Sequence, residues 1–237
     1  MIAARLALGL PPGVGLGLHA LGTQAPPLWP GETTAMRHAV PRRQAEFRAG
    51  RAAARRAMAA AGLPLAAIPA GRDRAPLWPA GTVGSITHGG DFALALAAPA
   101  ARFAGLGIDA EPALPLSPDV AALIVSARDR LEGAGLPACL APTLGFSAKE
   151  AVFKAQFPLT GRWLEFHDVA VTLGGADFTA TCGAVTLCGR WARVGGLFVS
   201  WLVLGAEQLG QLDRFGRGIV AGQCPTACDP THPGQPG

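Results

Sequence analysis

Cysteine is scarce in this sequence, and its spacing argues against the two common structural uses of the residue. The chain of 237 residues has five cysteines, an odd number at irregular intervals. Disulfide frameworks usually show an even number, and a structural zinc site needs four convergent ligands. The last two cysteines lie in a proline- and glycine-rich segment with His232 beyond them, which leaves no convincing fourth ligand. We therefore expect reduced thiols in a cytoplasmic protein. The cysteines are Cys139, Cys182, Cys188, Cys224 and Cys228.

The sequence also lacks the glycine-rich loop of Walker-type proteins and the signature motifs of kinases. Charged residues make up only 15% of the chain, with a net charge of +4. Arginines cluster in 37–56, which predicts one long helix that ends at Gly62. Only one aromatic residue, Phe47, lies among them, and no DNA or RNA motif is visible. The excess of basic residues is as consistent with binding of an acidic protein or a polyphosphate cofactor as with binding of nucleic acid.

Residues 6–31 carry no formal charge, yet they do not form a continuous hydrophobic run. A secretory segment or a membrane-spanning helix rarely tolerates their density of proline and glycine. We predict a strand at 3–10, a turn and a second strand at 14–20, and no membrane span. The interrupting residues are Pro11, Pro12, Gly13, Gly15 and Gly17.

The segment 146–154 carries the most informative charge pattern in the chain. It reads Phe-Ser-Ala-Lys-Glu-Ala-Val-Phe-Lys and predicts an amphipathic helix. Glu150 and Lys154 are four residues apart and share one face, next to Lys149. Such a carboxylate between lysines suits a metal-bound phosphate, although a charged helix face is more often only solvated. Three phenylalanines are spaced to bury the other face: Phe146, Phe153 and Phe157.

Upstream of this segment, an apolar stretch predicted as a strand ends in two carboxylates. Residues 102–108 lead into Asp109 and Glu111, which would point to the same side of a strand. Two such carboxylates repel each other unless a proton or a cation lies between them. Oxygen ligands without cysteine or histidine favour Mg²⁺ or Mn²⁺ over zinc. For this pair alone, a solvated loop at the end of a strand is an equally good interpretation.

A third segment, 84–91, reads Gly-Ser-Ile-Thr-His-Gly-Gly-Asp and precedes an alternating apolar run at 92–96. The pattern predicts a turn that leads into a half-buried strand. Ser85, Thr87 and His88 offer hydroxyl and imidazole groups beside flexible glycine backbone, which suits phosphate contacts. Taken alone, His88 is also consistent with a hydrogen-bonded structural histidine.

In this order, the three segments resemble the motifs of the 4′-phosphopantetheinyl transferases, in the two-lobed monomeric class of enterobactin-type and surfactin-type synthetase activators. The family pattern is Ser-x-(Ser/Thr)-His, then Gly-(Ile/Val)-Asp-x-Glu, then (Trp/Phe)-(Ser/Cys/Ala)-x-Lys-Glu-(Ala/Ser)-x-x-Lys. The likeness covers roughly residues 30–175 and includes 42–51 and 74–79, which are typical of the enterobactin-type branch. The three motifs match at 85–88, 107–111 and 146–154.

The resemblance implies a role for each matching residue. Asp109, Glu111 and Glu150 would be the ligands of Mg²⁺, or of Mn²⁺ in its place. Lys154 would contact the diphosphate of the co-substrate coenzyme A, near Asp109. The role of Lys149 is open between supporting the fold and facing the partner protein. Contacts with the phosphates of coenzyme A, its 3′-phosphate among them, are implied for Ser85, His88, Arg43 and Arg51. Contacts with its adenine are implied for Arg74 and Pro76.

The resemblance also implies the reaction. A serine hydroxyl of an apo acyl, peptidyl or aryl carrier protein attacks the β-phosphate of coenzyme A, and adenosine 3′,5′-bisphosphate leaves. Such a displacement needs positioning and neutralisation of charge on the phosphate oxygens, which Lys154 and the cation supply. Glu150 is the expected base, directly or through a water. A bound cation lowers the pKa of a carboxylate, so the identity of the base stays open.

The fold implied by the resemblance is α+β, with two pseudo-symmetric lobes, each a small antiparallel sheet packed with a long helix. We expect the N-terminal lobe at 1–105 and the C-terminal lobe at 106–215, with the metal site at their junction. Residues 216–237 have the composition of a disordered tail.

Periodicity and turn signals place the individual elements. We expect the first helical region to open within 32–39, and a connector after it to hold a short strand near Ile68. A second helix is predicted from the cap residue Ser117 to about Glu132. A loop at 133–142 would precede the helix of the third motif. Antiparallel strands are predicted at 92–98, 103–108, 164–173, 176–182, 186–194 and 197–204.

Two other functions stay open from the residues alone. A non-catalytic basic module would bind an acidic protein or nucleic acid through 42–56 and would tolerate loss of the three carboxylates. A different Mg²⁺-dependent phosphotransferase or hydrolase is the third possibility, without support from any nucleotide-binding motif. We expect the transferase: a cytoplasmic monomer that binds no nucleic acid and serves fatty-acid, polyketide, nonribosomal-peptide or siderophore synthesis, with secondary-metabolite pathways among them.

Overall fold

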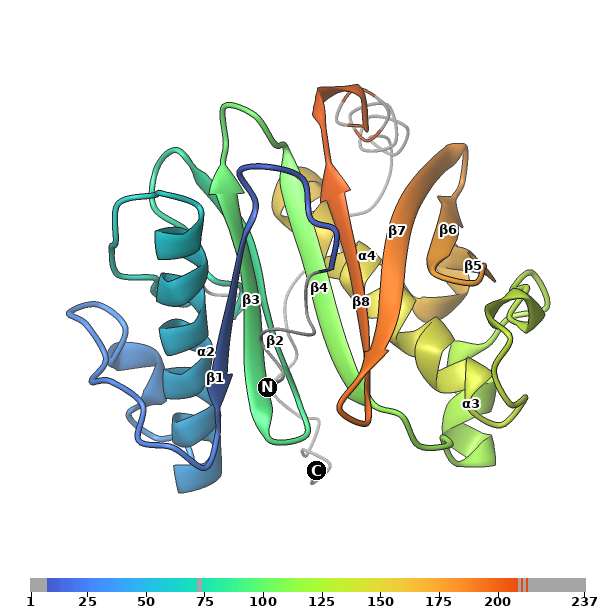
Figure 1. Cartoon of the computed structure of the whole chain (residues 1–237), viewed down its shortest axis with the longest axis horizontal. Helices are drawn as coiled ribbons and strands as arrows, with labels where there is room; N and C mark the ends of the chain where they lie inside the picture. Colours follow the sequence, from blue (N-terminus) through green and yellow to red (C-terminus); the bar gives the residue numbers. More distant parts are fainter. Residues whose placement is uncertain (1–7, 72–73, 209, 211, 213–237) are drawn as a thin grey trace, which may run out of the picture.

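Two antiparallel sheets, each packed against one long helix, form the fold (Figure 1). The computed structural model describes residues 8–71, 74–208, 210 and 212. The expected α+β fold class is confirmed, and the division of the chain at 105 stays a prediction. None of the helices in the described part is long and apolar enough to cross a membrane. The expected tail at 216–237, and most of the strand expected at 3–10, lie outside the described residues.

The first sheet has the strand order β1-β3-β2 and packs against helix α2. A short 3-10 helix, η1 (Thr34–Met36), precedes α2, which begins later than expected. Val40 has an extended backbone before Pro41, which occupies the first turn, where its missing N–H costs nothing. Near Ile68 there is no strand, only an isolated bridge between Ala70 and Pro76. The elements are β1 (Gly15–Ala20), α2 (Pro41–Ala60), β2 (Thr82–Gly89) and β3 (Phe92–Pro99).

The turn predicted within 84–91 forms only at 90–91, because residues 84–89 lie inside β2. The strand pairs with β3 along its whole length, from Thr82 opposite Pro99 to Gly89 opposite Phe92. The turn comes afterwards, at Gly90, whose φ of +54° suits glycine. Glycine in this motif therefore occurs both at closely packed positions of a strand and in a turn. Amino-acid composition alone does not distinguish these two uses.

The second sheet has the order β4-β8-β7-β6-β5 and packs against helix α4 (Ala141–Thr160). The strand expected from 164 begins only at Val169, because the 3-10 helix η3 (Phe166–Asp168) precedes it. Glu165 and Asp168 form a capping box around η3, which uses the backbone groups that a longer strand would need. The strands are β4 (Gly105–Pro112), β5 (Val169–Leu173), β6 (Asp177–Cys182), β7 (Val185–Val194) and β8 (Leu197–Leu204).

Helix α3 (Pro118–Ile124) begins at the predicted cap but is much shorter than predicted. The Ser117 hydroxyl accepts a hydrogen bond from the Val120 N–H, as expected for an N-cap. The helix stops because tertiary partners take the next backbone groups: Lys149 donates to the Ile124 carbonyl and Asp129 accepts from the Ser126 N–H. A second 3-10 helix, η2 (Glu132–Ala134), follows.

Pairs of glycines bring each long helix onto its sheet at backbone distance. A Cβ added to Gly17 in β1 would lie 1.9 Å from the Ala53 carbonyl oxygen of α2. A Cβ added to Gly107 in β4 would lie 1.9 Å from the Ala151 carbonyl oxygen of α4. Real Cβ atoms do not approach that closely, so only glycine allows these contacts. In both lobes, glycines in a strand thus allow the backbone of the long helix to contact the backbone of the sheet.

Among the described residues, three hydrophobic clusters form the core, one under each long helix and one between the sheets. The prediction that phenylalanines form the buried face of the motif helix is wrong, because small residues are needed for close approach to β4. Phe153 instead stacks on Phe157, with ring centroids 5.1 Å apart, and meets Trp163 at the half-exposed edge. The buried face of α4 consists mainly of Leu144, Ala148, Ala151, Val152 and Ala155.

Candidate active site between the two sheets

Strands β2 and β4 meet at the junction of the lobes without forming a shared ladder (Figure 1). The Ile108 N–H of β4 donates to the Ser85 hydroxyl oxygen of β2 at 3.1 Å. Ser85 is buried and does not line any of the cavities described below. Its hydroxyl therefore holds the two sheets together, a position that disfavours its expected contact with a phosphate.

The centre of the junction is an ion pair between strand and helix. The Lys154 ammonium of α4 lies 2.6 Å from Asp109 Oδ1 of β4. The Thr87 hydroxyl of β2 accepts from Lys154 at 3.1 Å and donates to the same carboxylate oxygen at 3.0 Å. Asp109 is 2% exposed, and its other oxygen, Oδ2, is buried without a hydrogen-bond partner. A buried, unpaired carboxylate oxygen is costly unless a ligand completes it.

Glu111 and Glu150 add further negative charge around this pair. Burial is the largest cause that raises the pKa of Glu111 to about 7; the Asp109 and Glu150 carboxylates contribute to this rise, and Lys154 opposes it. Burial also raises the pKa of Glu150, with Lys154 opposing and Asp109 adding to the shift. The three carboxylates thus lie close enough to affect one another. Within the described ranges, however, no three acidic, histidine or cysteine side chains converge tightly enough to form a metal-binding group.

A cavity of about 520 Å³ opens on the α2 side of β2. It is lined by residues of 34–39, of α2, of the connector at 70–76 and of β2, and the arginines among them outnumber the single carboxylate, Glu46. All but three of the residues predicted to contact coenzyme A line it, the exceptions being Ser85, Asp109 and Lys154. The predicted residues that line the cavity are Arg43, Arg51, Arg74, Pro76 and His88.

Arg51 is held rigidly in the wall of this cavity. Its Nε donates to the Ile68 carbonyl at 2.5 Å, its Nη2 donates to the Pro69 carbonyl, and its guanidinium lies 4.0 Å from the centre of the Phe47 ring. Burial lowers the pKa of Arg51 to about 10, with nearby Arg55 and Arg43 adding to the effect and Glu32 opposing it. The crowded positive charge makes an anion the natural ligand of the cavity.

A buried ion pair behind Arg51 supports that wall. Glu32 has no exposed surface and lies 2.8 Å from the Arg55 guanidinium. Its carboxylate also accepts from the Ile68 N–H at 2.9 Å and the Trp29 N–H at 2.8 Å. Three arginines share the basic side of α2. Arg51 and Arg55 are buried and hydrogen-bonded within the protein, whereas Arg48 is exposed. A surface for nucleic acid would need these guanidinium groups in solvent.

His88 and Glu46 lie between the 520 Å³ cavity and a second cavity that reaches the acidic residue Glu111. Both residues line the two cavities, and the second has a volume of about 600 Å³. Burial lowers the pKa of His88, and Arg43 lowers it further, which favours the neutral imidazole at neutral pH. Burial opposes ionisation of Glu46, but hydrogen bonds from Arg42 and Arg43 outweigh it and lower the pKa of that carboxyl.

Three residues of this site were not assigned from the sequence. Thr87 stands in the first motif, so its signal was present, but only the structure places it on Lys154 and Asp109. Glu32 carries no local signal, because its partners Arg55 and Ile68 come from elsewhere in the fold. Glu46 pairs with Arg42 and Arg43 of its own helix, and only the structure places it on the wall of two cavities.

Two family models match the chain over most of the described region. The model of the 4′-phosphopantetheinyl transferase N-terminal domain matches residues 31–98, and that of the 4′-phosphopantetheinyl transferase superfamily matches residues 105–190. The 4′-phosphopantetheinyl transferase Svp of Streptomyces mobaraensis is 40% identical over 220 residues, which cover 86% of this chain and 88% of that protein. The chain belongs to the 4′-phosphopantetheinyl transferase superfamily.

Other transferases of this family show the same relationship. The 4′-phosphopantetheinyl transferase PptT of Mycobacterium tuberculosis is 34% identical over 194 residues, covering 74% of this chain and 85% of that protein. Enterobactin synthase component D of Salmonella typhi is 38% identical over 131 residues, or 54% of each chain. The expected family and enzyme class are therefore confirmed. Phosphopantetheinyl transferases move the phosphopantetheine arm to carrier proteins, and the match to both family models covers the junction at which the motifs meet.

Proposed function

We propose that this transferase moves the 4′-phosphopantetheine arm of coenzyme A to a serine of an apo acyl, peptidyl or aryl carrier protein, and that the reaction depends on Mg²⁺ or Mn²⁺. The observation that carries this proposal is that β2 connects a cationic cavity to the buried Asp109–Lys154 pair: His88 lines the cavity, and its neighbour Thr87 bonds to both members of the pair. A ligand with a phosphate at one end and a diphosphate in its middle fits that succession of charges.

The adenosine end of coenzyme A would occupy the 520 Å³ cavity. Arg43, Arg51 and His88 would contact the 3′-phosphate, since guanidinium and imidazole groups donate to phosphate oxygens. Arg74 and Pro76 would lie beside the adenine at the other wall. The diphosphate would then pass His88 toward Lys154, whose ammonium can donate to its oxygens.

The chemistry of the acidic residues fits a hard divalent cation. Asp109, Glu111 and Glu150 provide only oxygen donors, which Mg²⁺ and Mn²⁺ prefer. Asp109 Oδ2 is buried and accepts no hydrogen bond from the described residues, as expected of an atom that ligates a cation. These three residues would hold the ion, which when bound would neutralise charge on the phosphate oxygens.

The protein's own groups would supply the remaining chemistry. Lys154 would neutralise the charge that grows on the diphosphate during displacement. Glu150, beside a small groove that also contains Phe153 and Trp163, would accept the proton of the carrier serine directly or through a water. Thr87 would hold the Lys154 ammonium in place through its hydrogen bond.

The decisive experiment incubates the purified chain with coenzyme A, Mg²⁺ and a panel of apo carrier proteins, and weighs the products by mass spectrometry. We expect phosphopantetheine to be added to at least one carrier, the addition to stop with EDTA and to return with excess Mg²⁺ or Mn²⁺. A binding module would leave the carriers and coenzyme A unchanged, and a hydrolase would consume coenzyme A without labelling a carrier. Either result would overturn the proposal.

Replacing Arg43 with alanine is expected to raise the KM for coenzyme A by about 10-fold, because a hydrogen bond to a charged group contributes roughly 1.5–3 kcal/mol. The KM for dephospho-coenzyme A, which lacks the 3′-phosphate, should change much less. Arg42→Ala is the matched control: Arg42 and Arg43 both bond to Glu46, but only Arg43 lines the 520 Å³ cavity. Equal effects on the two co-substrates would place the 3′-phosphate elsewhere.

The carrier protein and pathway remain to be assigned by the same panel. The name of the relative from Salmonella typhi connects that protein to enterobactin synthesis. We include siderophore and other secondary-metabolite carriers in the panel for this reason. Action as a cytoplasmic monomer that binds no nucleic acid stays a prediction.

A further inference from the structure

Directly beside Glu150, another buried ion pair connects helix α4 to the loop that follows α3. Lys149 is 3% exposed and Asp129 is 8% exposed. The Lys149 ammonium lies 2.8 Å from Asp129 Oδ2. Neither residue has a role in the chemistry proposed above. Burying two charges costs desolvation free energy, so the presence of this pair needs an explanation other than stability.

The Lys149 ammonium has no hydrogen left for a substrate. An ammonium has three N–H donors. In addition to the bond to Asp129, Lys149 donates to the Ile124 carbonyl at 2.8 Å and to the Phe166 carbonyl at 2.9 Å. Lys149 also lines the small groove beside Glu150, so a role in substrate binding would have been a natural interpretation of its place in the motif. Saturation of its donors points instead to a role in holding structure.

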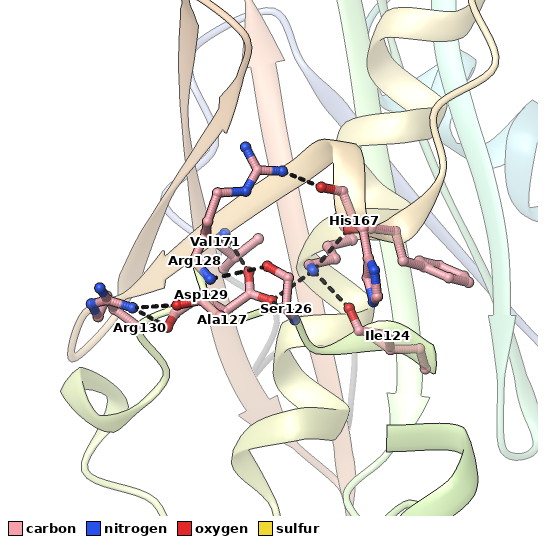
Figure 2. A network of polar contacts seen from close by, with 10 residues as sticks. Ile124, Ser126, Ala127, Arg128, Asp129, Arg130, His167 and Val171 are labelled. Carbon is pink, nitrogen blue, oxygen red and sulfur yellow. Dashed lines mark hydrogen bonds and ion pairs between the residues drawn. The ribbon is translucent and has the colours of Figure 1, made fainter. Parts of the chain in front are cut away.

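Asp129 extends the same network into the sheet. Its Oδ1 accepts from the Val171 N–H of β5 at 2.7 Å, and its Oδ2 accepts from the Ser126 N–H at 2.7 Å. Figure 2 shows this loop, with Asp129 at the centre of the contacts and Ile124, Ser126 and Val171 around it. Burial opposes ionisation of Asp129, but the bonds from Lys149, Val171 and Ser126 outweigh it and lower the pKa of this carboxyl. A carboxylate with this many donors is a rigid anchor.

The pair lies where it can set the orientation of the catalytic helix. On the side of β4, Gly107 lets the helix backbone rest directly on the strand, which sets their separation. Lys149 joins the helix to the end of α3, to β5 through Asp129 and to η3 through Phe166. Glu150 is the next residue along the helix, and Lys154 follows a little more than one turn later. A rotation of α4 about its axis would move both side chains relative to Asp109.

We propose that the Lys149–Asp129 pair positions helix α4, so that Glu150 and Lys154 face Asp109 in the geometry that transfer requires. Lys149 and Asp129 are positioning residues, which touch neither coenzyme A nor the carrier. This inference rests on the proposed transferase function. It assigns the Lys149 of the motif to the fold rather than to the partner protein.

The test compares wild type with two variants, using coenzyme A and an apo carrier that wild type modifies. Lys149→Met keeps the length of the side chain but leaves the Asp129 charge unpaired. The double variant Lys149→Met, Asp129→Asn removes both charges and therefore keeps the fold accessible if the single variant fails to fold. We expect kcat per folded molecule to fall between about 10- and 100-fold in the folded variants, because a displacement on the order of 1 Å has that effect.

The KM for coenzyme A and its dissociation constant by calorimetry should stay within about twofold of wild type, since the adenosine cavity is unchanged. The matched control is Arg128→Ala: the guanidinium of Arg128, labelled in Figure 2, donates to the His167 carbonyl in the same network and not to Asp129. This variant should keep the wild-type kcat. The fraction of folded protein is measured by circular dichroism for every variant.

Two results would overturn the inference. If kcat per folded molecule of the double variant stays within about twofold of wild type, the pair serves stability alone. If the KM for coenzyme A rises while kcat is unchanged, Lys149 contacts the substrate after all. Failure of wild type to modify any carrier would instead overturn the proposed function, so the two failures are distinguishable.

Discussion

Replacing Asp109 with asparagine is expected to lower the rate of carrier modification by about 100- to 1,000-fold, the range seen when one electrostatic partner of a transition state is removed. The asparagine keeps the shape of the side chain but cannot pair with the Lys154 ammonium or offer two anionic oxygens to a cation. The fold should persist, because the Lys154 side chain is 26% exposed and can turn its ammonium to solvent.

The rate is measured from the time course of conversion of the apo carrier to its modified form by mass spectrometry. Asp177→Asn is a suitable control, because Asp177 is an exposed carboxylate on β6, in the same sheet but away from the junction. Thermal unfolding of both variants separates loss of the fold from loss of function. If Asp109→Asn retained more than about a tenth of the wild-type rate, the metal and lysine roles assigned to this carboxylate would be wrong.

A single added methyl group at Gly107 is expected to damage both stability and transfer. The Cβ would lie 1.9 Å from the Ala151 carbonyl oxygen and 2.9 Å from a methyl carbon of Leu202. Gly107→Ala must therefore push α4 away from β4 by a distance on the order of 1 Å, which can cost about 100-fold in rate at an active site. We expect the free energy of unfolding to fall by about 3 kcal/mol, at the upper end for overpacking.

Urea unfolding and the carrier assay together check this prediction. The matched control is Gly175→Ala, because a Cβ there would meet no atom within 4 Å and the residue has an ordinary φ. Wild-type stability and rate in Gly107→Ala would mean that the helix does not rest on the strand as described. A loss of stability with an unchanged rate per folded molecule would show that the position of α4 is not critical for catalysis.

Much of the fold could be predicted from local patterns. Short apolar segments correctly indicated β1, β3 and the strands β6 to β8. Burial alternates along β1, β6 and most of β7, as a strand with one covered face requires, whereas β3 and β8 are buried along nearly their whole length. Ser117 followed by Pro118 correctly indicated the start of α3. The start of a helix is encoded by residues next to it in the chain, so these signals could be read without knowing the fold.

The end of α3 could not be predicted in this way. The backbone groups that would have continued the helix bond to Lys149 and Asp129, side chains whose positions depend on the rest of the fold. The same is true of segment 84–91, in which glycines suggested a turn although only 90–91 form one. There β2 pairs with β3 throughout, and a Cβ at Gly84 would collide with the Trp78 ring at 2.3 Å.

The candidate site shows the same division. Motif resemblance singled out Asp109, Glu111, Glu150 and Lys154, which all lie at the junction. The residues that hold these groups in place were not visible, because a buried side chain bonded to a distant backbone carbonyl leaves no periodic signal. Ser85 is the clearest case: its motif position suggested a phosphate contact, yet its hydroxyl accepts from the Ile108 N–H and lies buried between two strands.

Residue order and spacing were thus sufficient to indicate the family and the α+β class and to propose the residues of the site, since these depend on near neighbours along the chain and on residue type. The three-dimensional arrangement was needed to learn why Gly107 is glycine, where α3 stops and what Lys149 contacts. Each of these depends on atoms that are distant in sequence and approach one another only when helix α4 lies against β4 and the lobes meet.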